Sequence, residues 1–87
     1  MRLQPQGLWP NFYQGLCASR QGRHADAVTA FSVCIGAAPQ AAGCFYNRAV
    51  AYTALGRREQ ARLDYQQAAR LDPSRAVFAP GRGKEPR

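Results

Sequence analysis

The sequence has few of the residues that catalytic, metal-binding or cofactor sites require. Its only histidine is His24, and its five acidic residues form no paired arrangement. Its three cysteines lack the Cys-x-x-Cys spacing of metal and redox sites, and it has no glycine-rich phosphate loop. His24 opens a predicted helix, where we expect it to be exposed and without a nucleophile to activate. We therefore predict no enzyme activity, no catalytic residue, no metal and no cofactor.

Long apolar segments are also missing. No run approaches the roughly 20 residues that span a bilayer, and residues 1–7 lack the apolar core of a secretory signal. We therefore expect a cytoplasmic protein with no membrane partner. In that reducing compartment the cysteines would be small, buried or half-buried hydrophobes. A Cys34–Cys44 disulfide is the alternative.

What the sequence does contain is an internal repeat with a spacing of 34 residues. Identical or similar residues recur at this spacing in five pairs: Gly15/Ala49, Gly22/Gly56, Ala27/Ala61, Phe31/Tyr65 and Pro39/Pro73. A period in this range indicates a repeat architecture in which each unit is one supersecondary element. Such proteins usually bind other proteins and rarely perform chemistry.

Apolar residues at helical spacing, interrupted by glycine and proline, predict an all-α fold. Gly22 and Gly56 suit the left-handed caps that end helices, and residues before Pro39 and Pro73 are pushed out of the helical region. We predict four helices in two antiparallel pairs, over about 10–21, 24–37, 42–55 and 58–71. Gly15 is one of the small residues that should let paired helices approach closely.

The second copy carries the more specific pattern. Its key residues are Phe45, Ala49, Tyr52, Leu55, Gly56, Ala61, Tyr65, Ala68 and the Leu71-Asp72-Pro73 ending. The chain resembles the tetratricopeptide repeat (TPR) family over about residues 8–75. The first copy departs from that pattern at Asn11, Gln14 and Ala18, where the family has large packing residues. The resemblance implies a short right-handed α-solenoid with an N-terminal lead (1–7), two repeats (8–41 and 42–75), and a truncated further helix with a disordered basic tail (76–87).

The resemblance also implies where a partner binds. In the family, the first helices of successive repeats line a concave groove that takes an extended peptide or a helix. The groove residues carried over to this sequence are Trp9, Phe12, Tyr13, Leu16, Ser19, Arg20, Tyr46, Asn47, Val50, Thr53 and Ala54. Asn47 would either hydrogen-bond a ligand backbone or bond within its own helix pair. Phe12 and Leu16 occupy the positions of the family's carboxylate clamp, so we expect an apolar, aromatic groove with Arg20 and Arg48 near its edge.

Three functions remain open. The leading one is a non-catalytic protein-binding scaffold. The second is the C-terminal TPR fragment of a larger bacterial signalling protein such as a Ser/Thr kinase. The third is an RNA-binding helical repeat, supported only by the net charge of +7. Eleven of the twelve cationic residues are arginine. A nucleic-acid partner is disfavoured because no nucleic-acid motif accompanies the charge.

Two repeats are few, because stability normally requires three or more. We therefore expect a marginal or self-associating chain: a fragment, a truncated reading frame, or a module completed by a second copy.

Overall fold

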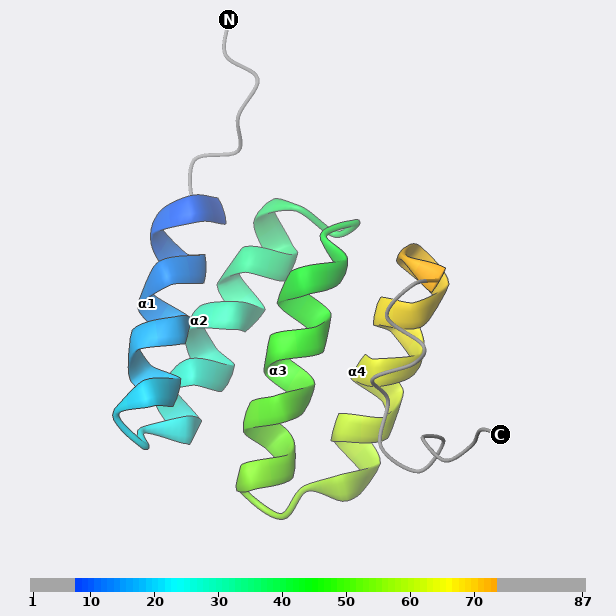
Figure 1. The fold of residues 1–87 in the computed structure, drawn as a ribbon. Coiled ribbons are helices and arrows are strands. Elements are labelled where there is room, and N and C mark those ends of the chain that lie inside the picture. The colour runs from blue at the N-terminus through cyan, green and yellow to red at the C-terminus, as the bar shows by residue number, and fades with distance from the viewer. Residues whose placement is uncertain (1–7, 74–87) are drawn as a thin grey trace, which may run out of the picture.

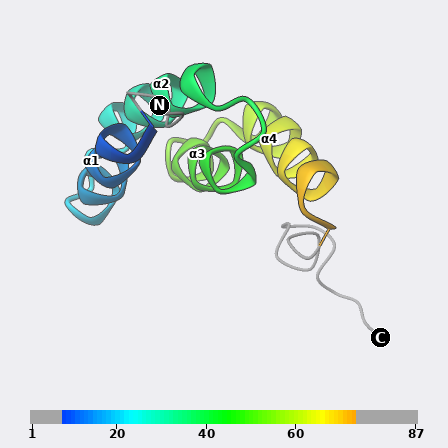
Figure 2. The same cartoon turned by 90° about the horizontal axis from the view of Figure 1, so that it is seen from above.

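Four α-helices make up the part of the chain that the computed structural model describes, residues 8–73. They are α1 (Leu8–Arg20), α2 (His24–Ala37), α3 (Ala42–Ala54) and α4 (Arg58–Leu71). Each helix is antiparallel to the next, and the four stand side by side in chain order (Figure 1). Seen from above, α3 is set off to one side of α2 and α4 (Figure 2). No strand occurs between residues 8 and 73. The predicted all-α fold of two antiparallel helix pairs is confirmed, whereas residues 1–7 and 76–87 lie outside the described part.

The helices within each pair are joined by the same glycine turn. Gly22 and Gly56 have φ angles of +80° and +81°, the left-handed conformation that suits glycine. The amide of Arg23 donates to the carbonyl of Ala18 over 2.8 Å, and the amide of Arg57 makes the equivalent bond to Tyr52. This pattern is the Schellman motif, which satisfies carbonyls left unpaired at a helix end. The predicted glycine caps are therefore present in both repeats.

The other two helix ends are set by proline. Ala38 and Asp72, which precede Pro39 and Pro73, adopt ψ angles of 82° and 95° and so leave the helical region. The observed helix ends lie within one residue of prediction. The start of α1 differs more, because that helix begins at Leu8 and includes Pro10 in its first turn, where proline's missing N–H costs no hydrogen bond.

Small residues let the helices approach closely around two aromatic rings. In the first repeat Phe31 is buried against Gly15, where an added Cβ atom would lie 2.7 Å from the nearest ring atoms. In the second repeat Tyr65 packs with Ala49 and Ala61. Ala51 of α3 packs into the cluster of the first repeat beside Phe31. Helix α3 therefore contributes to the apolar clusters of both repeats, with Ala51 in the first and Ala49 in the second.

Candidate functional site

A cluster of three aromatic rings lies at the start of α1. The ring centroids of Trp9 and Phe12 are 6.0 Å apart, those of Trp9 and Tyr13 are 6.1 Å apart and stacked, and those of Phe12 and Tyr13 are 5.9 Å apart. Trp9 and Tyr13 nonetheless remain 48% and 60% exposed. We call these three residues the aromatic cluster. It presents a rigid apolar surface to solvent, a feature typical of interaction sites.

The cluster is anchored to the core through Phe12. The Phe12 ring meets the buried Phe31 ring edge-on, with centroids 5.8 Å apart. The second repeat reproduces this contact at the equivalent positions, where Tyr46 meets Tyr65 edge-on at 5.5 Å. Both Phe12 and Tyr46 are half-buried. Each ring is thus fixed by its own helix pair while keeping part of its surface accessible.

The remaining predicted groove residues lie in different environments. Leu16 is half-buried against the core of the first repeat, whereas Val50 and Arg20 are exposed. Asn47 is half-buried, and its Nδ2 donates to the carbonyl of Gly43 over 2.8 Å. This bond lies within α3 itself, and hydrogen bonding of Asn47 to a ligand backbone stays a prediction. Because α1 and α3 contact each other directly, we call their predicted groove residues together the α1–α3 face.

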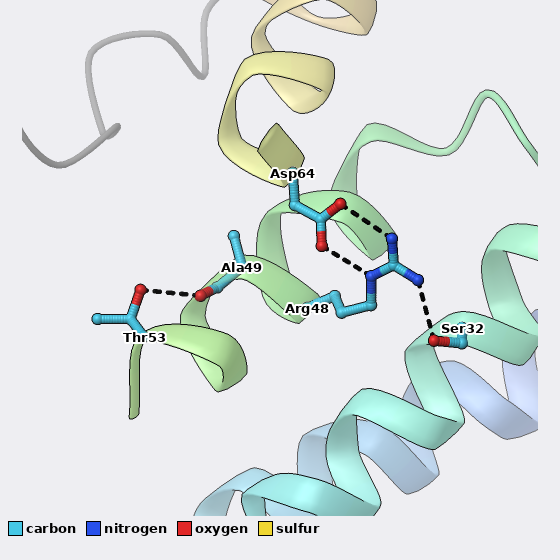
Figure 3. A network of polar contacts seen from close by, with 5 residues as sticks. All are labelled: Ser32, Arg48, Ala49, Thr53 and Asp64. Atoms are coloured by element: carbon cyan, nitrogen blue, oxygen red, sulfur yellow. Dashed lines mark hydrogen bonds and ion pairs between the residues drawn. The ribbon is translucent and has the colours of Figure 1, made fainter. Parts of the chain in front are cut away.

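Arg48 does not lie at the edge of this face, contrary to expectation. Its Nε and Nη2 atoms donate to the two carboxylate oxygens of Asp64 on α4, over 2.7 and 2.9 Å (Figure 3). Its Nη1 donates to the hydroxyl of Ser32 on α2, over 2.9 Å. The guanidinium also lies 5.8 Å and 5.6 Å from the ring centroids of Phe45 and Tyr52. Arg48 therefore joins three helices and belongs to the structural framework.

The electrostatics agree with a framework role. The Asp64 side chain is only 8% exposed and that of Arg48 only 20% exposed. Hydrogen bonding to Asp64 raises the pKa of Arg48 above its ordinary value, so the guanidinium stays charged. The sequence did not reveal this pair, because the 34-residue period identifies only residues that recur in both repeats. At the positions equivalent to Arg48 and Asp64, the first repeat has Gln14 and Ala30. The pair could have been recognised from the presence of an arginine and an aspartate on helix faces that the apolar pattern predicts to be packed.

In the first repeat, the positions equivalent to Arg48, Asp64 and the neighbouring aromatic rings line a hollow of about 250 Å³ between α1 and α2. Where the second repeat has Phe45, Arg48 and Tyr52, the first has shorter side chains. The residues that line the hollow are Asn11, Gln14, Ala18, Arg23, Asp26, Thr29, Ala30 and Val33. The departures from the family pattern noted in the sequence thus have a physical consequence, which is unfilled space.

Two further expectations are wrong. Cys17 is exposed, whereas only Cys34 and Cys44 are buried. His24 is half-buried rather than exposed, although it opens α2, and its Nδ1 atom is buried without a hydrogen-bond partner in the described structure. Within residues 8–73 no group of three His, Cys, Asp or Glu side chains is placed to hold a metal ion. No helix in this part is long and apolar enough to cross a membrane.

Comparison with known proteins assigns both repeats. Residues 11–41 and residues 42–75 each match a family model described as tetratricopeptide repeat. The boundary between the two matches falls between residues 41 and 42, where α3 begins. No curated protein and no solved structure matches the chain.

Proposed function

This chain belongs to the tetratricopeptide repeat family, and we propose that it is a scaffold module that binds a protein partner across the α1–α3 face. Repeats of this family are generally protein–protein interaction modules. The matched regions are repeat units only, and no catalytic domain is among them. The proposal for this chain takes the partner to be an extended peptide or a helix.

The observation that carries the proposal is the exposed aromatic cluster. A tryptophan and a tyrosine that are each about half exposed cost free energy in water, because their apolar surface stays hydrated. Both rings are already ordered by mutual stacking, so a partner that covers them loses little side-chain entropy. Tryptophan and tyrosine are also enriched among the residues that dominate binding energy at interfaces.

The second support is the arrangement of the neighbouring repeat. Tyr46 and Val50 on α3 occupy positions equivalent to Phe12 and Leu16 on α1, so the two helices offer a continued apolar strip. A ligand that begins on the aromatic cluster can extend along α1 onto α3. The exposed Arg20 in the last turn of α1 adds a positive charge at the far end of the strip from Trp9.

Site-specific photo-crosslinking tests the proposal directly. Tyr13 is replaced by the photoreactive p-benzoylphenylalanine in the full chain, which is then irradiated in a cell extract. Leu63 on α4 is the matched control, because it is 58% exposed where Tyr13 is 60% exposed. We expect a discrete protein adduct from position 13 and none from position 63.

Alanine substitution then tests the energetics. Replacing Trp9 or Tyr13 by alanine should weaken capture of that partner by about 30-fold, the equivalent of about 2 kcal/mol. Equal crosslinking from both positions, or capture unchanged by the two alanine variants, would exclude the aromatic cluster as the binding site. Loss of capture by ribonuclease treatment would instead favour an RNA-bridged interaction.

A further inference from the structure

Two buried thiols meet at the junction between the two repeats. Cys34 lies on α2 in the first repeat and Cys44 on α3 in the second, and they are 0% and 1% exposed. Their side chains are hydrogen-bonded to each other across the interface between these helices. Protein-binding by the α1–α3 face does not use them, and the equivalent of Cys34 in the second repeat is Ala68. The contact is therefore peculiar to this junction.

We propose that Cys34 and Cys44 are the site of a reversible disulfide that ties the first repeat to the second. The oxidant is a low-molecular-weight disulfide such as glutathione disulfide. One protein thiolate attacks a sulfur of that disulfide and releases one thiol, forming a mixed disulfide. The second cysteine then attacks the protein sulfur of the mixed disulfide and releases the second thiol. Overall, two protein thiols lose two protons and two electrons, and one small disulfide becomes two thiols.

The closed structure controls how fast this reaction runs. Burial raises the pKa of the Cys34 thiol to about 12 and raises that of Cys44, so little reactive thiolate exists at neutral pH. A bulky oxidant also cannot reach side chains that are essentially unexposed. Oxidation therefore proceeds through molecules in which α2 and α3 have separated locally. Once re-closed, the bond is shielded from reductants for the same reason.

The consequence is a fixed junction between the repeats. Besides the contact of the two thiols and the packing around Ala51, α2 and α3 are joined by the hydrogen bond from Arg48 to Ser32. A disulfide would close the short chain segment 35–43 and restrict the unfolded chain. For a loop on the order of ten residues, the loop-entropy relation gives a roughly 100-fold shift of the unfolding equilibrium towards the folded state.

The test uses the full chain incubated with glutathione disulfide at a low urea concentration, which populates the open form. The expected product is a monomer whose peptide map links Cys34 to Cys44 and whose intact mass is lower by two hydrogen atoms, apart from any glutathione bound to the exposed Cys17. Its unfolding equilibrium should shift roughly 100-fold, and excess reduced glutathione at the same urea concentration should reverse both changes. The oxidation rate should rise with urea, because opening limits it.

Three variants serve as controls. Cys34→Ala copies the residue that the second repeat carries at this position, so it should fold, and it should gain neither the mass change nor the stability. Cys44→Ser should behave likewise. Cys17→Ser removes the exposed thiol and should leave intramolecular oxidation unchanged. The proposal fails if wild-type protein yields only glutathione adducts, only dimers linked through Cys17, or a Cys34–Cys44 bond that does not stabilise the fold.

Discussion

The Arg48–Asp64 pair makes a sharp test of what holds the second repeat together. We consider Asp64→Ala, which removes the carboxylate that accepts two hydrogen bonds from the guanidinium. Arg48 would retain its bond to Ser32 and its aromatic neighbours Phe45 and Tyr52. Its charge would then remain in a poorly hydrated position with its main partner missing.

The expected loss follows from burial. Removing one partner of a buried ion pair costs about 3–5 kcal/mol, because the remaining charge is left uncompensated. The Arg48 side chain keeps 20% of its surface exposed, so water can partly replace the carboxylate. We therefore expect a loss of about 3 kcal/mol, near the lower end of that range. For a domain of this size, that loss lowers the Tm by roughly 12–24 °C.

A double variant separates charge burial from packing. Arg48→Gln combined with Asp64→Ala gives the second repeat the residues Gln14 and Ala30 that the first repeat has at these positions. Because the double variant leaves no buried charge, it should be more stable than Asp64→Ala alone. Urea unfolding followed by circular dichroism measures all four members of the cycle. If the two substitutions are additive, or if Asp64→Ala costs under about 0.5 kcal/mol, the ion pair does not stabilise the fold as argued.

Three other perturbations have defined outcomes. Gly15→Ala should lower stability by about 1–3 kcal/mol in thermal melts, because the added methyl group would meet the buried Phe31 ring. Gly36→Ala is the control, because an added Cβ there meets no atom within 4 Å, and it should be neutral or stabilising by up to about 1 kcal/mol. Gly56→Ala should cost about 1 kcal/mol in the same melts, because its φ of +81° disfavours a side chain. Stability should fall as pH rises from about 9 to about 12, since the pKa of Cys34 is raised in the folded state and the unfolded thiol loses its proton first. The slope from this one group is at most about 1.4 kcal/mol per pH unit, and Cys34→Ala should abolish that part of the alkaline loss.

The helical framework was predictable because its signals are local. A glycine at a helix end and a residue before a proline fix the backbone of their immediate neighbours whatever surrounds them. The turns at Gly22 and Gly56 and the extended Ala38 and Asp72 therefore match prediction. The 34-residue spacing further predicted which side chains are equivalent, and the edge-on contacts of Phe12 and Tyr46 with their partner rings bear out that equivalence.

The side-chain partners were less predictable because they depend on which face of a helix meets which neighbour. Arg48 is one residue from Asn47 and two from Val50, so sequence alone did not show that it points towards α4 and α2. The exposure of Cys17 was missed for a similar reason. Its equivalent in the second repeat is Ala51, which is buried only because α3 packs onto the preceding pair. The repeat period identifies equivalent positions in the two copies, but equivalent positions need not have the same neighbouring residues.

That inequality links binding to the stability of the first repeat. In the second repeat, a bidentate ion pair joins α3 to α4. In the first repeat, the hollow lies at the corresponding place, and α1 exposes two large rings. α1 packs chiefly on α2, whereas α3 packs on both α2 and α4. A ligand that covers Trp9 and Tyr13 and extends onto Val50 adds contacts between α1 and α3. Since such a ligand binds only when both helices are in place, its binding free energy also stabilises the folded first repeat. The repeat with the weaker internal connections is therefore the one whose folding a bound partner would favour most.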